Sequence, residues 1–213
     1  MSLEEIKKLY ERRKKDIERR LKEFKELFER SSDDRIFAEL IFCLLTPQSR
    51  AKKCWEVVEN LMEKGLLLGG DHGEVLRELE GVRFRKRKAW YVIEARKTFA
   101  SGGKIRMKDT IRNFSSPGEA REWLVKNVKG MGYKEASHFL RNIGMGEDFA
   151  ILDRHILKNL KVLGIIDSIP RSMTKKRYMK IEGRMRRFSR EIGIPMSHLD
   201  LLFWSKETGE VFK

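Results

Sequence analysis

The chain of 213 residues carries a formal net charge of +15 and has a sequence pI of about 9.9. A chain of this length can bury a substantial core, in one domain or in two small lobes. So large an excess of positive charge favours a polyanionic partner. The many Lys, Arg and Glu residues, beside a single glutamine, are typical of a thermophile.

Cysteine content and hydropathy exclude several classes of protein. Cys43 and Cys54 are the only cysteines, too few for a disulfide framework or a four-cysteine metal site. Both lie in apolar helical patterns, which predicts buried free thiols. The first residues lack the apolar stretch of a signal peptide, and the longest apolar run, LIFCLL at 40–45, falls far short of the ~20 residues that span a bilayer. We therefore expect a cytoplasmic monomer with no membrane contact.

Apolar residues spaced by three and four predict helices along nearly the whole chain. The first begins near residue 3, and a buried helix over 34–45 stops at the turn Thr46-Pro47-Gln48-Ser49. Ser49 is placed to cap the next helix, which ends near Gly65. Further helices are predicted at 73–79, 87–100, 116–128, 134–143, 153–163, 174–192 and 196–207. Since no pair of segments alternates as sheet strands do, the predicted fold class is all-α.

The loop GMGEDF at 144–149 predicts a crossing between two helical lobes. The first lobe is expected over 31–148, as a central helical barrel that includes a helix-hairpin-helix at 116–144. Residues 1–30 together with 149–213 are expected to form the second lobe. A binding cleft would then lie between the two.

A glycine hairpin, Gly130-Met131-Gly132 after Lys129, joins two of the predicted helices. Glycine lets the backbone turn tightly and approach a ligand closely. The N–H groups that begin the second helix carry the positive end of its dipole. The hairpin therefore predicts a site for a nucleic-acid phosphate, held without reading sequence. An ordinary turn between two helices would show the same glycine spacing.

Lys134 and Asp153 are the candidate catalytic residues. Lys134 lies in the first turn of the second helix, where the helix dipole disfavours a positive charge. Desolvation there would favour a neutral amine, which is a nucleophile. Asp153 follows three apolar residues and opens a helix, so it is either an ordinary N-cap or a carboxylate that holds a cation-like group. His155 is expected to orient the same turn.

These stretches together resemble the helix-hairpin-helix DNA glycosylase superfamily. Its signature is a hairpin of the type h-G-h-G, a lysine just past it in bifunctional members, and an aspartate further on; here these are Val128–Gly132, Lys134 and Asp153. The absence of cysteine after Cys54 excludes the iron–sulfur branches. The ending LLFWSKETGEVFK at 201–213 is similar to the archaeal-type second family of 8-oxoguanine DNA glycosylase/AP lyases, whose members end in a lysine that reads the flipped base.

The resemblance implies a role for each matching residue. Lys134 would attack C1′ of the damaged nucleotide while Asp153 stabilises positive charge on the sugar. Lys213, Trp204 and Phe84 would recognise the flipped base. DNA contacts would come from Gln48, Lys129, Gly130, Met131, Gly132 and Arg154. Basic clusters at 83–88 and 175–190 would add phosphate contacts.

The expected partner is double-stranded DNA containing 8-oxoguanine or an abasic site, which places the protein at the nucleoid when it acts. No cofactor, iron–sulfur cluster or structural metal is expected, apart from a monovalent cation at the hairpin. Three alternatives stay open: a non-catalytic helix-hairpin-helix DNA-binding module, a glycosylase for another damaged base, and an RNA-binding protein.

Overall fold

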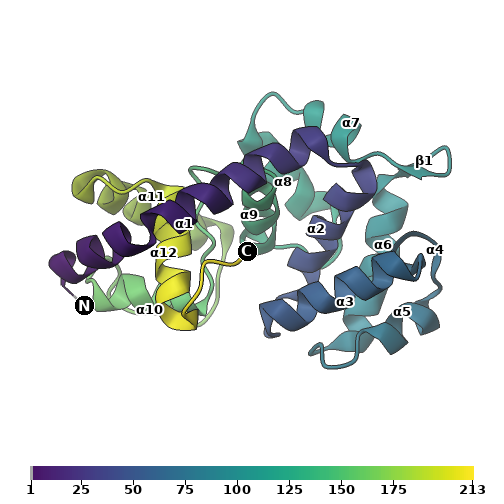
Figure 1. The fold of residues 1–213 in the computed structure, drawn as a ribbon, viewed down its shortest axis with the longest axis horizontal. Coiled ribbons are helices and arrows are strands. Elements are labelled where there is room, and N and C mark those ends of the chain that lie inside the picture. Colours follow the sequence, from purple (N-terminus) through teal and green to yellow (C-terminus); the bar gives the residue numbers. More distant parts are fainter. Residues whose placement is uncertain (1) are drawn as a thin grey trace.

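The computed structural model describes residues 2–213, which form twelve helices and one two-stranded sheet (Figure 1). The first half contains α1 (Leu3–Arg30), α2 (Asp33–Leu45), α3 (Ala51–Glu63), α4 (Leu66–Gly69), α5 (His72–Glu78) and α6 (Arg85–Phe99). The strands β1 (Ala100–Ser101) and β2 (Lys104–Ile105) follow, and then α7 (Met107–Arg112), α8 (Pro117–Asn127) and α9 (Tyr133–Asn142). The last part contains α10 (Arg154–Val162), α11 (Lys175–Ile192) and α12 (Met196–Thr208). The predicted all-α fold class is confirmed.

The apolar side chains gather into two separate cores. The first core is built from α2, α3, α6, α8 and α9 with the short helices around them. The second is built from α10, α11 and α12. The long α1 contributes to both, because Phe28 belongs to the first core and Phe24 to the second. In Figure 1 this helix runs along both parts of the molecule. The predicted lobe boundaries at residues 30 and 148 stay a prediction.

Four short elements were not expected. The strands β1 and β2 pair antiparallel around Gly102 and Gly103, both of which have positive φ. Two residues per strand are too few to show alternation in a sequence. The helices α4 and α7 span 4 and 6 residues, too short for a clear apolar period. No helix between residues 2 and 213 combines the length and the apolar character needed to cross a membrane.

The cap predicted for Ser49 was wrong. The N-cap of α3 is Arg50, whose side chain makes no capping bond. The Ser49 hydroxyl accepts hydrogen bonds from the Arg83 N–H at 3.0 Å and from Lys88 Nζ at 3.1 Å. The serine therefore joins the turn before α3 to the turn before α6.

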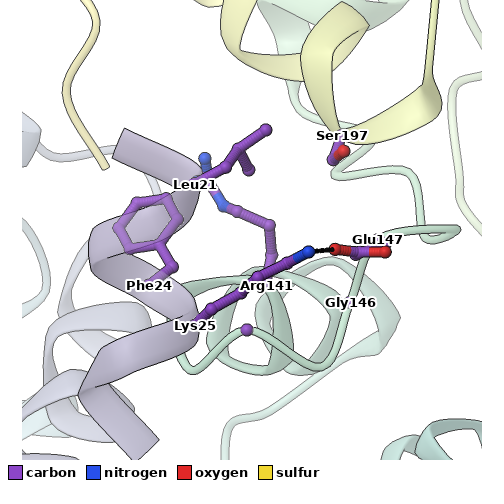
Figure 2. A pocket seen from close by; sticks show the side chains of 8 residues that line it. Leu21, Phe24, Lys25, Arg141, Gly146, Glu147 and Ser197 are labelled. Atoms are coloured by element: carbon purple, nitrogen blue, oxygen red, sulfur yellow. Dashed lines mark ion pairs between the residues drawn. The ribbon is translucent and has the colours of Figure 1, made fainter. Parts of the chain in front are cut away.

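The two cores meet along the 144–149 loop, where glycine permits close packing. A Cβ on Gly144 would lie 2.6 Å from the Cα of Lys25, and one on Gly146 would lie 2.6 Å from the backbone nitrogen of Arg141. Figure 2 shows the cavity that remains here, together with the 2.6 Å ion pair between Lys25 and Glu147. Its volume of about 10 Å³ admits about one water and excludes a base.

A buried ion pair crosses between the cores nearby. The Arg121 guanidinium on α8 donates to both carboxylate oxygens of Glu182 on α11, at 2.7 and 3.2 Å. Its guanidinium carbon also lies 3.9 Å from the centre of the Phe149 ring. Because the geometry is bidentate and both side chains are buried, this pair fixes α8 relative to α11.

Candidate active site

The hairpin between α8 and α9 has the tight backbone that its glycines predict. Gly130 has φ +85°, in the left-handed region, and a Cβ there would lie 2.4 Å from the Tyr91 ring. Met131 is buried between the two glycines, and its N–H donates to the Val128 carbonyl at 3.1 Å. Glycine at position 130 is therefore required both by the backbone angle and by the neighbouring ring.

Glu135, a residue that sequence reasoning missed, connects the hairpin to the candidate nucleophile Lys134. One carboxylate oxygen accepts the Gly132 N–H at 3.0 Å, and the other lies 3.0 Å from Lys134 Nζ. The Gly132 N–H, at the N-cap of α9, is thus already bonded within the protein. An acidic residue at the third helical position was the available sign, because it commonly reaches back to the N-cap.

Lys134 lies in the first turn of α9, as predicted, and its side chain is 21% exposed. Its charge acts on the buried side chains of Cys43, Cys54 and His138, which lie on helices of the first core. Burial lowers the pKa of His138 well below its ordinary value, and the charges of Arg141 and Lys134 lower it further. His138 is therefore neutral one helical turn beyond the lysine.

Asp153 is the N-cap of α10. Its Oδ1 accepts the N–H groups of His155 and Ile156, each at 2.8 Å, which fixes the carboxylate at the start of the helix. The preceding segment is held from α11: the Tyr178 hydroxyl donates to the Ala150 carbonyl at 2.5 Å, and the Ala150 N–H donates to Glu182 at 3.0 Å. The position of Asp153 thus depends on buried contacts made three residues earlier.

A second carboxylate, that of the buried Asp200, lies close to Asp153. Burial raises the pKa of Asp200 to about 7, and the negative charge of Asp153 raises it too, while Arg141 lowers it. Arg141 Nη1 lies 3.4 Å from Asp200 Oδ2. Asp153 is therefore close enough for its charge to act on the buried pair of Arg141 and Asp200.

Lys213 folds back into the first core. Its ammonium lies 2.5 Å from the carboxylate of the fully buried Glu39, and 3.0 Å from the centre of the Trp55 ring. The Glu39 carboxylate also pairs with Arg35 at 2.8 Å and accepts from the Asn142 amide at 3.0 Å. Sequence reasoning missed Glu39 and Trp55. Glu39 is the single acidic residue inside the apolar run IFAELIFCLL, which indicates a buried carboxylate that needs a partner.

The predicted aromatic residues of the base pocket do not lie against each other. The ring of Trp204, on α12, packs against Phe212 with centroids 6.3 Å apart. Phe84 is 52% exposed, and the Arg83 guanidinium lies 5.2 Å from its ring. Within residues 2–213 no ring contact joins Trp204 to Phe84. Their shared role in holding a base stays a prediction.

The other predicted DNA contacts are on the surface. Gln48, Lys129 and Arg154 are exposed, each in a turn or at a helix start. Gln48 has φ +57°, which is unusual for a residue with a side chain. Beside the hairpin lies an open pocket of about 340 Å³, lined by Arg87, Trp90, Tyr91, Glu94 and Lys129. Cations and aromatic rings together suit a nucleic-acid backbone.

Comparison with known proteins gives a consistent result. Residues 17–194 match the family model of 8-oxoguanine DNA glycosylase. The chain is 46% identical over 209 residues to an 8-oxoguanine DNA glycosylase/AP lyase of Fusobacterium nucleatum, covering 98% of this chain and 96% of that one. It is 38% identical over 214 residues to the corresponding protein of Methanocaldococcus jannaschii, with all of both chains covered.

Solved structures agree with this result. The M. jannaschii enzyme bound to a 15-mer DNA containing 8-oxoguanine superimposes with a TM-score of 0.89 at 36% identity, covering 99% of each chain. The 8-oxoguanine DNA glycosylase of Thermotoga maritima gives a TM-score of 0.88 at 35% identity, covering 99% of this chain and 98% of that one. The fold and the sequence match agree over nearly the whole length, and the chain therefore belongs to the 8-oxoguanine DNA glycosylase family.

Proposed function

We infer that this protein is a bifunctional 8-oxoguanine DNA glycosylase and AP lyase that acts in base excision repair. The observation that carries the proposal is the placement of Lys134 at the start of the helix after the glycine hairpin. This placement occurs in a chain that superimposes along its length on a family member bound to 8-oxoguanine DNA. A non-catalytic binding module would need the hairpin but no lysine at this position.

Binding begins at the phosphate backbone. The hairpin, with Lys129 exposed beside it, holds a phosphate near the lesion. With a net charge of +15 the protein releases many counterions on binding, so affinity falls steeply as salt increases. The damaged nucleotide must then leave the duplex, because a stacked base cannot be reached. Gln48 fills the space that the base leaves.

Chemistry follows at the sugar. In its unprotonated form the Lys134 amine attacks C1′, the bond to 8-oxoguanine breaks, and the attacking nitrogen gives one proton to the departing base. The C1′–O4′ bond then breaks as the nitrogen forms a double bond to C1′, and the second nitrogen proton passes to O4′. A Schiff base now joins Lys134 to the opened sugar. The Asp153 carboxylate stabilises the positive charge that develops on the sugar. Removal of a proton from C2′ then allows β-elimination, which breaks the strand on the 3′ side. Lys213, with Trp204, reads the extruded base.

Borohydride trapping tests the proposal. Reduction of the Schiff base should link the intact protein covalently to duplex DNA containing 8-oxoguanine. Lys134→Gln should abolish the adduct and largely spare binding. Lys126→Gln is the matched control, since this exposed lysine of α8 has no role in the proposed reaction. If the intact protein yields no adduct on 8-oxoguanine or on abasic DNA, the lyase proposal is wrong. An adduct only with other lesions would instead assign a different damaged base.

A further inference from the structure

Lys88 belongs to the basic cluster 83–88 that was expected to contact phosphates, but it is buried and cannot reach one, and no step of the proposed reaction uses it. It lies in the first turns of α6 and is 3% exposed. Its ammonium donates to the carbonyl oxygens of Leu45 at 2.6 Å and Pro47 at 2.7 Å, and to the Ser49 hydroxyl at 3.1 Å. A lysine ammonium has three donors, and all three are used here.

The partners of Lys88 surround one residue, Gln48. Pro47 and Ser49 are its two neighbours in the chain, so the ammonium holds the turn on both sides of it. Leu45 is the last residue of α2, and its carbonyl lacks a partner within the helix. The lysine thereby fixes the exposed Gln48 to the end of a buried helix.

The same contacts reach Phe84. The Ser49 hydroxyl accepts the Arg83 N–H as well as Lys88 Nζ, and the Lys88 N–H donates to the Phe84 carbonyl at 3.1 Å. We call the contacts among Lys88, Ser49 and Arg83 the Lys88 bridge. It joins two turns that lie far apart in the sequence. One exposes Gln48, which is predicted to contact DNA, and the other exposes Phe84, which is predicted to recognise the base.

The two exposed residues share a strained backbone. Among residues 2–213, Gln48 and Phe84 are the only residues other than glycine with positive φ, at +57° and +61°. A side chain in this region is costly and persists only where the surroundings enforce it. Such strain concentrates at ligand-binding sites, and the Lys88 bridge is what enforces it here.

Burying this ammonium carries a cost of its own. Burial lowers the pKa of Lys88 to about 8, and the nearby charge of Lys134 also lowers it, although Glu135 and Cys54 raise it. Methionine or leucine would fill an apolar space without this cost. A lysine at this position is therefore better explained by the three acceptors that it joins than by packing.

We propose that Lys88 is a positioning residue for base extrusion, holding Gln48 and Phe84 as one preformed unit that enters the DNA stack as the lesion leaves it. Phe84, which is exposed and has no ring contact with Trp204 within residues 2–213, then acts in the stack and not in the base pocket that the resemblance implied for it. The inference rests on the proposed function, and it adds a group that contacts neither the base nor the sugar. Preformed side chains matter because DNA binding then need not also order two strained turns.

Lys88→Met tests the proposal, since it keeps the length of the side chain and removes its donors. Single-turnover rates should be compared on two duplexes: one with 8-oxoguanine paired to cytosine and one with a preformed abasic site. We expect at least a roughly tenfold loss on the paired lesion, because small errors of position are costly, and a much smaller loss at the abasic site. The fluorescence of 2-aminopurine next to the lesion should rise less at equal occupancy, which reports extrusion directly.

Two further variants make the outcome decisive. Lys86→Met removes an exposed charge one half-turn away, and it should weaken binding to both duplexes in parallel. Ser49→Ala removes only the hydroxyl. It should lower the ratio of the rate on the 8-oxoguanine duplex to the rate on the abasic duplex, as Lys88→Met should. Ser49→Ala replaces Lys88→Met in the test if Lys88→Met does not fold. Equal losses on both duplexes, in variants with a normal melting curve, would show that the bridge is merely structural. If the intact protein releases no 8-oxoguanine, the proposed function fails instead.

Discussion

The Lys213 ammonium lies 2.5 Å from the carboxylate of Glu39, a residue 174 positions earlier in the chain. Glu39 is fully buried, and its partners Lys213, Arg35 and Asn142 converge on it from three directions. An unpaired carboxylate would be very costly at this depth, so the contact anchors the end of the described chain. It also holds the Lys213 ammonium over the Trp55 ring, 3.0 Å from the ring centre.

Lys213→Met should impair excision of 8-oxoguanine more than cleavage at a preformed abasic site. Methionine keeps an apolar stem against Trp55 and loses the ammonium that we propose reads the base. Single-turnover rates on the two substrates measure the difference. Lys206→Met, at an exposed residue of α12 that bonds Asn159 and Glu207, is the control. Equal losses on both substrates would contradict a role in recognising the base.

The same residue predicts a dependence on pH. Burial lowers the pKa of Lys213 to about 8 from 10.5, while Glu39 opposes this effect. The ammonium is therefore present below about pH 8 and is lost above it. The ratio of base excision to abasic-site cleavage should fall between pH 7 and pH 9. The effect of Lys213 on stability has the opposite sign to its effect on excision. In the unfolded chain the lysine keeps its proton up to about pH 10.5, whereas in the folded protein it loses the proton above about pH 8. The free energy of unfolding therefore increases as the pH rises from 8 to 10.5.

Lys213→Arg provides the control for this dependence, because a guanidinium keeps its charge over the whole range. Its excision ratio should stay level between pH 7 and pH 9. A fall equal to that of the intact protein would assign the titration to another group. Lys88 is the first alternative, since burial lowers its pKa to about 8 as well.

Gly130→Ala should weaken DNA binding and lower the melting temperature. A Cβ would lie 2.4 Å from the Tyr91 ring, and φ of +85° strains any side chain, so a loss of about 2 kcal/mol in stability is expected. Gly118→Ala is the matched control: this helical glycine has ordinary φ and no atom closer than 3.6 Å to the added carbon. Calorimetry and fluorescence anisotropy measure the two effects. Unchanged affinity in a folded Gly130→Ala protein would contradict a phosphate site at the hairpin.

The helices were predictable because each follows from local spacing. The buried helix expected at 34–45 is Asp33–Leu45, and the one expected at 196–207 is Met196–Thr208. Lys134 and Asp153 were identifiable for the same reason, since a hairpin and an N-cap are local patterns. The contacts of Glu39 with Lys213, and of Lys88 with Pro47, depend on how helices pack. A periodic pattern does not specify which distant residues face one another, so these parts of the site appeared only in the structure.

Replacing Arg121 should destabilise the protein and also slow catalysis. Arg121→Met leaves the Glu182 carboxylate buried without its bidentate partner, and breaking such a pair costs about 3–5 kcal/mol. Glu182 also accepts the Ala150 N–H, so its displacement shifts the segment that leads to Asp153. We therefore expect slower base excision even at temperatures where the variant is fully folded.

A double-mutant cycle separates these two effects. Glu182→Gln removes the negative charge of the same pair. The double variant Arg121→Met with Glu182→Gln should lose less stability than the two single variants added together, because neither charge of the pair is left buried without the other. Its catalytic rate should nevertheless remain low, since glutamine and methionine do not restore the bidentate contact that fixes α8 to α11. Urea unfolding gives the stabilities, and single-turnover excision gives the rates. If the double variant regained full activity, the ion pair would be needed only to neutralise buried charge and would play no part in placing Asp153.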